Sequence, residues 1–205
     1  LFTGLFGLVL GLGLLKFGNP VILDHLVGTP TSLQEWRIFA WPVRIGYGLL
    51  AVALLAGVVV IGRQWSPLFT RLPAVLLLSW LAWQAVAAGV NPANAASTAV
   101  LPHFAACVAC FALGHLALAR APETRTFWLC LAGGFVGVLA MAADQRFGGL
   151  EATRKMILES PEAQRLPAEY LARIQSNRVF STLVYPNALA GAVLLLLPPC
   201  TALAW

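Results

Sequence analysis

Charged residues are scarce in this sequence. Of its 205 residues, 13 are Lys or Arg and 8 are Asp or Glu, whereas 60% are hydrophobic. A single soluble core cannot bury that much apolar surface, so the composition excludes an ordinary soluble domain. The sequence therefore predicts an integral membrane protein.

The sequence also lacks a surface on which basic and aromatic residues alternate, as nucleic-acid-binding proteins have. Its net charge of +5 comes almost entirely from residues between the apolar runs. That placement favours contact with anionic membrane lipids and argues against nucleic acid as a partner. The four cysteines all lie inside apolar runs, where cysteine behaves as a small hydrophobic residue, so they indicate no redox compartment: Cys107, Cys110, Cys130 and Cys200.

Long apolar runs are the main feature of this sequence. Four runs without Asp, Glu, Lys or Arg cover residues 45–62, 72–90, 99–119 and 126–143. A helix of about 20 residues crosses the hydrocarbon core of a bilayer, so each run predicts a membrane span. Residues 1–15 are interpreted as the end of a first span and residues 187–205 as the start of a sixth. Because the chain begins and ends inside apolar runs, we expect it to be part of a longer polypeptide.

Residues 144–186 differ in composition, with six basic and five acidic residues. This predicts one long amphipathic loop outside the membrane, with an N-cap at Ser160-Pro161-Glu162 and a helix on which Tyr170, Leu171 and Ile174 share a face. The expected fold class is thus all-α, a polytopic transmembrane helical bundle with one long extramembrane loop. Counting Lys and Arg by loop leaves the orientation open, because the acids of the long loop nearly match its basic residues.

Three further local patterns predict structure. Ser32 followed by Glu35 predicts a capping box at the start of a short helix. The aromatic residues after it, Trp36, Phe39 and Trp41, are typical of a membrane interface. Pro198-Pro199 is expected to kink the last apolar helix or end it early.

The boundary between the long loop and the last apolar run carries the most specific pattern. It reads Arg178-Val-Phe-Ser-Thr182-Leu-Val-Tyr-Pro186-Asn187-Ala-Leu-Ala190-Gly191. This stretch resembles the Arg, Thr, Pro-Asn and Ala-Gly pattern that opens a central span in the bacterial O-antigen ligase and polymerase superfamily.

The resemblance implies a multi-span glycosyltransferase of the bacterial inner membrane that needs no metal or cofactor. Such an enzyme takes a glycan from an undecaprenyl-diphosphate carrier and joins it to a hydroxyl of a lipid or glycan acceptor. The resemblance also implies that the long loop lies in the periplasm. Family members use a later external loop with an essential His and a further Arg. No such loop is present in this stretch, so we expect enzyme activity only from a longer chain and assign no catalytic residue.

Residue chemistry supports a substrate-binding role for Arg178. A guanidinium offers paired, permanently charged donors to phosphate oxygens, and a diphosphate gains negative charge as the glycosidic bond breaks. Pro186 and Asn187 are expected to form the loop-to-helix turn, with Asn187 as N-cap or polar contact. Gly191 is expected to allow close approach of another helix or a lipid, and Thr182 belongs to the same motif. The alternative is that Arg178 only anchors a helix end at the membrane surface.

Other functions remain open from the sequence. His103, Cys107 and Cys110 lie on one helical face, as a metal or thiol site would require, but a zinc site needs a fourth ligand and small cysteines are common where helices pack. His115 is an ionisable residue inside a span, which is costly and therefore of interest. A secondary transporter and a non-catalytic membrane subunit are the alternatives to the transferase.

Overall fold

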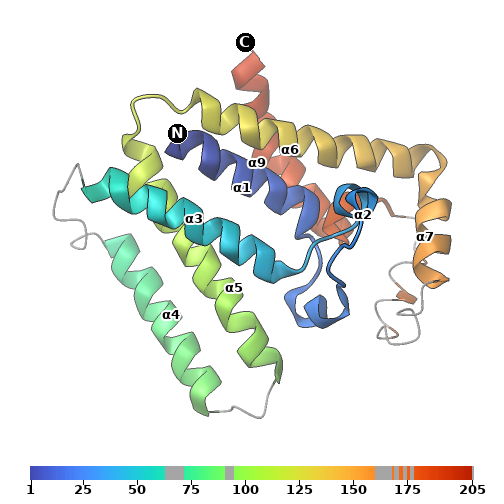
Figure 1. Cartoon of the computed structure of the whole chain (residues 1–205), viewed down its shortest axis with the longest axis horizontal. Helices are drawn as coiled ribbons and strands as arrows, with labels where there is room; N and C mark the ends of the chain where they lie inside the picture. Colours follow the sequence, from blue (N-terminus) through green and yellow to red (C-terminus); the bar gives the residue numbers. More distant parts are fainter. Residues whose placement is uncertain are drawn as a thin grey trace.

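The computed structural model describes residues 1–62, 72–90, 95–159, 168, 171, 172, 175 and 178–204. Every regular element within these residues is a helix (Figure 1), which confirms the all-α helical bundle. The N-cap predicted at residues 160–162 lies outside the described residues, and so do Tyr170 and Ile174 of the helix face predicted with Leu171.

Six apolar helices account for most of the described chain. They are α1 (Phe2–Lys16), α3 (Val43–Gly62), α4 (Leu72–Val90), α5 (Ala95–Ala112), α6 (Arg125–Asp144) and α9 (Pro186–Ala204). α5 continues through a π-helical segment, η2 (Leu113–Ala117), and a 3-10 turn, η3 (Leu118–Arg120). The shorter elements are η1 (Val21–Leu26), α2 (Leu33–Ile38), η4 (Gln145–Gly149), α7 (Leu150–Leu158) and η6 (Ser181–Leu183).

Four helical segments are long and apolar enough to cross a bilayer. They cover Val43–Gly62, Ala99–Arg120, Arg125–Ala152 and Pro186–Leu203, and two shorter apolar helices cover Phe2–Lys16 and Val75–Val90. Their length and composition make this chain a helical membrane protein.

The helix α1 lies between α3 and α6, and α4 packs beside α5, which also contacts α3 (Figure 1). Glycines allow α1 and α6 to come very close. A Cβ atom on Gly11 would lie 2.8 Å from the carbonyl oxygen of Cys130, and one on Gly134 would lie 2.5 Å from Cα of Gly11. In lipid, helices associate through such close van der Waals packing, because burying apolar surface away from lipid tails gains little.

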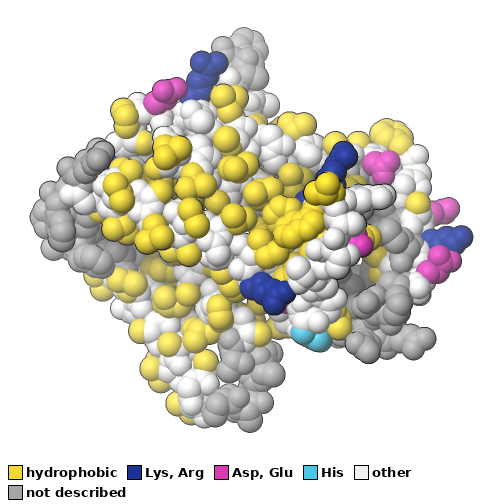
Figure 2. Space-filling view, viewed as in Figure 1, with side chains coloured by type: hydrophobic (Ala, Val, Ile, Leu, Met, Phe, Trp, Pro, Cys, Tyr) yellow, Lys and Arg dark blue, Asp and Glu magenta, His cyan; other side chains and the backbone are white. Residues whose placement is uncertain are grey.

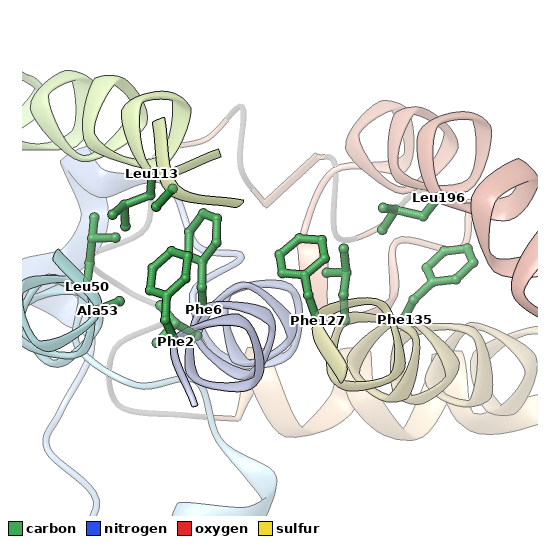
Figure 3. Packing of buried hydrophobic residues seen from close by; sticks show 11 residues of the cluster. Phe2, Phe6, Leu50, Ala53, Leu113, Phe127, Phe135 and Leu196 are labelled. Carbon is green, nitrogen blue, oxygen red and sulfur yellow. The ribbon is translucent and has the colours of Figure 1, made fainter. Parts of the chain in front are cut away.

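Aromatic and aliphatic side chains fill the spaces beside this contact. Figure 3 shows Phe2 and Phe6 of α1 near Leu113 and Leu50, while Phe127 and Phe135 project from α6 and Leu196 comes from α9. The rings of Phe6 and Phe127 have their centroids 5.6 Å apart, which is within the range of favourable aromatic pairs. One continuous cluster therefore joins α1, α3, η2, α6 and α9.

Large apolar side chains also cover much of the outer surface. In Figure 2 hydrophobic side chains spread over the left and centre of the face, whereas most charged ones lie toward the right, near α7. Leu55 of α3 is 70% exposed and Leu194 of α9 is 78% exposed. A bilayer would cover these side chains, which accounts for the exposed apolar surface of the chain.

The connection between α1 and α3 confirms the capping box. Ser32 is the N-cap of α2, and its Oγ accepts a hydrogen bond from the backbone N of Glu35 at 3.2 Å. The Glu35 carboxylate reaches back to Thr31, accepting from its backbone N at 2.7 Å and from its hydroxyl at 3.1 Å. In the usual capping box the Glu side chain accepts from the backbone N of the N-cap residue. Here Glu35 accepts instead from the backbone N of Thr31, the residue before the N-cap.

The aromatic residues of this connection gather at the end of α1. The rings of Trp36 and Trp41 are 4.9 Å apart, and the Trp41 indole donates to the carbonyl of Trp36 at 2.9 Å. The Lys16 ammonium donates to the carbonyls of Arg37 and Phe39 and lies 5.7 Å from a Trp41 ring centroid. The Lys16 cation and the Trp41 ring therefore interact at the C-terminal end of α1.

Two expectations about helix ends are corrected in part. Of the kink or early end expected at Pro198-Pro199, the early end is wrong, because α9 continues through both prolines to Ala204. Thr201 donates its hydroxyl to the carbonyl of Pro198 at 2.8 Å, one way in which such helices satisfy backbone groups near a proline. At its other end α9 begins with Pro186, so Asn187 is the second helical residue and not the N-cap.

Candidate functional site

The Arg178 motif forms a compact turn between the loop and α9. We call residues 178–187 the junction segment. Ser181–Leu183 form the 3-10 turn η6, and Pro186 starts α9 at the first helical position, where a missing N–H costs nothing. The carbonyl of Tyr185 accepts the first hydrogen bonds of α9, from Ala188 N at 3.0 Å and Leu189 N at 3.1 Å.

Two hydroxyl groups tie the junction segment to helices distant in sequence. Ser181 donates its hydroxyl to the carbonyl of Val138 in α6 at 2.6 Å. Thr182 donates its hydroxyl to the carbonyl of Leu14 in α1 at 2.7 Å. Leu14 lies in the last turn of α1, where carbonyls lack partners within the helix, so Thr182 satisfies one of them.

Gln145 fixes the same turn from α6. Its side-chain oxygen accepts hydrogen bonds from the backbone N of Phe180 at 3.2 Å and of Ser181 at 2.8 Å. Gln145 is 3% exposed and Ser181 is 5% exposed, and they are the two buried polar residues among those described. Buried polar groups need hydrogen-bond partners. The Gln145 side-chain oxygen and the Ser181 backbone N–H serve as partners for each other.

The junction segment also packs directly against the residues that follow α1. A Cβ atom on Gly18 would overlap the carbonyl oxygen of Thr182 and would lie 2.8 Å from Cα of Leu183. Only glycine fits at this position without moving the turn. The segment is therefore held by α1, by α6 and by the chain after α1 together.

Two residues of the turn have strained backbones. Ser181 has φ of 55°, and Val184 has φ of 62° with ψ of −31°. Val184 is the central residue of a three-residue turn in which Tyr185 N donates to the carbonyl of Leu183 at 2.6 Å. Positive φ is a clear outlier for a β-branched residue, and this type of γ-turn is rare and strained. Strained backbones of this kind cluster at functional sites.

Arg178 stands at the exposed start of this anchored turn. Its side chain is exposed, and none of the residues that the structure describes forms a hydrogen bond or ion pair with it. Phe180, two residues later, is 7% exposed and belongs to the buried part of the segment. The guanidinium is thus accessible from solvent while the chain beside it is held in place.

The other residues of the motif occupy different positions. Asn187 and Gly191 are both exposed on α9. No atom of the described residues lies within 4 Å of a Cβ built on Gly191, so the expected close approach of a helix is not seen there. The structure brings Thr182 and Pro186 into the turn and leaves Asn187 and Gly191 on the outer surface.

Gln145 is a residue of the site that the sequence does not predict. It lies 36 positions before Ser181, and a single glutamine between Asp144 and Arg146 at the end of an apolar run carries no pattern that sets it apart. Its role depends on which segment folds back onto α6, and only the tertiary structure shows that.

The cysteines and histidines of α5 are not assembled into a metal site. Within the described parts of the chain, no group of three or more His, Cys, Asp or Glu residues is placed to hold a metal ion. His103 and Cys107 are exposed and Cys110 is half-buried. Nε2 of His115 is buried without a hydrogen-bond partner in the described structure, and the ring stacks on Phe111 at 5.6 Å.

Fold and site together define a class: a helical membrane protein with an exposed arginine at an anchored loop-to-helix junction. No family model, no curated protein and no solved structure matches this chain.

Proposed function

We propose that this protein belongs to the bacterial inner membrane and acts in glycan transfer of the O-antigen ligase or polymerase type. In this role Arg178 binds the diphosphate of an undecaprenyl-diphosphate-linked glycan. The observation that carries the proposal is the position of Arg178: exposed, and two residues before a turn held by α1 and α6 at the start of an apolar helix.

The position suits a lipid-linked diphosphate. A diphosphate carried on a polyprenyl chain lies at the boundary between lipid and water, where the start of a membrane helix also lies. Arg178 needs to give up no partner in the described structure before it binds phosphate oxygens. Charged hydrogen bonds of this kind contribute about 1.5–3 kcal/mol each.

The chemistry that this arrangement serves is substitution at a sugar carbon. The acceptor hydroxyl oxygen forms a bond to the anomeric carbon, and the bond from that carbon to the diphosphate oxygen breaks. The bonding pair leaves with undecaprenyl diphosphate, whose negative charge Arg178 stabilises. The residue that takes the hydroxyl proton is not assigned.

The test is the affinity for undecaprenyl diphosphate of the purified protein in lipid nanodiscs. Arg178→Ala is expected to weaken binding about 10-fold or more, because a loss of about 1.4 kcal/mol corresponds to a factor of ten. Arg178→Lys keeps the charge but loses the paired donors, so an intermediate affinity is expected.

Arg125→Ala is the matched control. Arg125 is also exposed and starts α6, at the opposite end of that helix from Gln145 and about 30 Å away along its axis. It is expected to leave the affinity unchanged. Equal affinities for the Arg178→Ala and Arg125→Ala proteins would overturn the proposal. A transporter or a non-catalytic membrane subunit would then be the better interpretation.

A further inference from the structure

Gln145 carries a buried side-chain amide that lies against the junction segment. It lies at the point where α6 passes into the π-helical segment η4, and 3% of it is exposed. Its oxygen accepts from Phe180 N and Ser181 N, and its amide nitrogen lies 3.5 Å from the carbonyl of Ser181. All of its side-chain hydrogen bonds in the described structure therefore go to two consecutive residues of the junction segment.

These hydrogen bonds satisfy two backbone N–H groups that have no acceptor within the turn itself. Phe180 and Ser181 precede or begin a short 3-10 turn, so their N–H groups have no partner within a helix. Buried N–H groups without partners cost about 1–3 kcal/mol each. Gln145 satisfies both, and it does so in the strained conformation with Ser181 at φ of 55°.

The position of Arg178 follows from this contact. Two residues of extended chain span at most about 7 Å, so Cα of Arg178 stays within that distance of Cα of Phe180. Phe180 is buried and its backbone N is held by Gln145. That hydrogen bond ties the backbone of residue 180, from which the chain leads back through residue 179 to Arg178. Without it, the strained turn can relax and the direction of residue 178 is no longer fixed.

We propose that Gln145 is a positioning residue that holds Arg178 where the lipid-linked diphosphate binds. This inference rests on the proposed function, and it assigns to Gln145 a role in ligand affinity that goes beyond stabilising the fold. The inference is based on one contact: the buried side-chain amide of Gln145 accepts hydrogen bonds from the backbone N–H groups of Phe180 and Ser181, which follow Arg178 by two and three residues.

A double-mutant cycle tests the inference, with undecaprenyl diphosphate as the probe and the protein in nanodiscs. Gln145→Met keeps the length and approximate volume of the side chain and removes the acceptor oxygen. Alone it is expected to weaken binding about 5-fold, and in the Arg178→Ala background it is expected to have no further effect, because there is then no guanidinium to position. A purely structural role would lower the affinity by the same factor in both backgrounds.

A spin label at position 178, attached through a keto amino acid so that the native cysteines are untouched, gives a second readout without ligand. Its distance distribution to a second label on α1 is expected to be narrow and to broaden in Gln145→Met. If Gln145→Met does not fold, Gln145→Asn, which keeps an amide too short to reach both N–H groups, is expected to give the same broadening.

The outcomes separate the two proposals. If Arg178→Ala weakens binding but Gln145→Met has no effect or an equal effect in both backgrounds, the proposed function stands and the positioning role is overturned. If Arg178→Ala leaves binding unchanged, the proposed function is overturned, and an unchanged label distribution in Gln145→Met would overturn the positioning of residue 178 as well.

Discussion

Gly11 of α1 and Gly134 of α6 are in direct backbone contact. A Cβ atom on Gly134 would lie 2.5 Å from Cα of Gly11, a distance that real Cβ atoms do not adopt. Since neither partner is a flexible side chain, the two helices would have to separate to accommodate a methyl group. This contact sets the distance between α1 and α6. α1 carries Leu14, which binds Thr182, and Gln145 directly follows α6.

Gly134→Ala is therefore expected to destabilise the protein by about 1–3 kcal/mol, as overpacked interiors do. Gly133→Ala is the matched control, because Gly133 is exposed on the same helix and, outside the backbone of that helix, no atom of the described residues lies within 4 Å of a Cβ built there. It is expected to be neutral or slightly stabilising, since alanine favours a helix more than glycine does. Thermal unfolding in detergent measures both. Equal losses for the two variants would contradict the close packing.

Val184→Gly is expected to stabilise the junction segment by about 1 kcal/mol. Glycine adopts the positive φ of this position without strain, although it also adds freedom to the unfolded chain. Val184→Ala keeps a Cβ and hence the strain, so it is the control and is expected to give no gain. The measurement is the unfolding midpoint of each variant. A lower midpoint for Val184→Gly than for Val184→Ala would show that the turn is not strained.

Glu35 is expected to titrate below its ordinary pKa of 4.5. The backbone N–H of Thr31 is the largest cause, followed by the Thr31 hydroxyl, because both stabilise the charged carboxylate and lower the pKa. The contribution of Glu35 to the start of α2 is thus present above pH 4.5 and is lost as the pH falls through the lowered value. NMR titration of the carboxyl carbon measures this. Thr31→Val removes the hydroxyl and keeps the N–H, so it should reverse part of the shift, whereas a pKa at or above 4.5 in the native protein would contradict the capping box.

Replacing Cys107 and Cys110 together by serine is expected to change neither the zinc content nor the affinity for undecaprenyl diphosphate. No metal-binding group is assembled in the described residues, and Cys107 is exposed on α5. Metal analysis of the purified protein and the nanodisc binding assay check this prediction. A loss of bound zinc or of binding in the double variant would point instead to a thiol or metal function.

The apolar helices were predictable because their signal is local. A run without charges for about 20 residues predicts a span whatever surrounds it, and the expected run at residues 126–143 corresponds to α6 at Arg125–Asp144. The capping box at Ser32 and Glu35 was predictable for the same reason. The early helix end expected at Pro198-Pro199 was wrong. Pro198 and Pro199 stand inside α9, because an apolar helix in lipid keeps its backbone hydrogen-bonded where it can.

The sequence by itself determined that this is a helical membrane protein and that Arg178 precedes a loop-to-helix junction. Those properties depend on composition and on neighbours along the chain. Only the tertiary structure decided what holds the junction, since Thr182 bonds to Leu14 across 168 positions and Ser181 to Gln145 across 36. Such contacts arise when α1 and α6 pack together through glycine, and single residues on distant helices carry no signal of which partner they will meet.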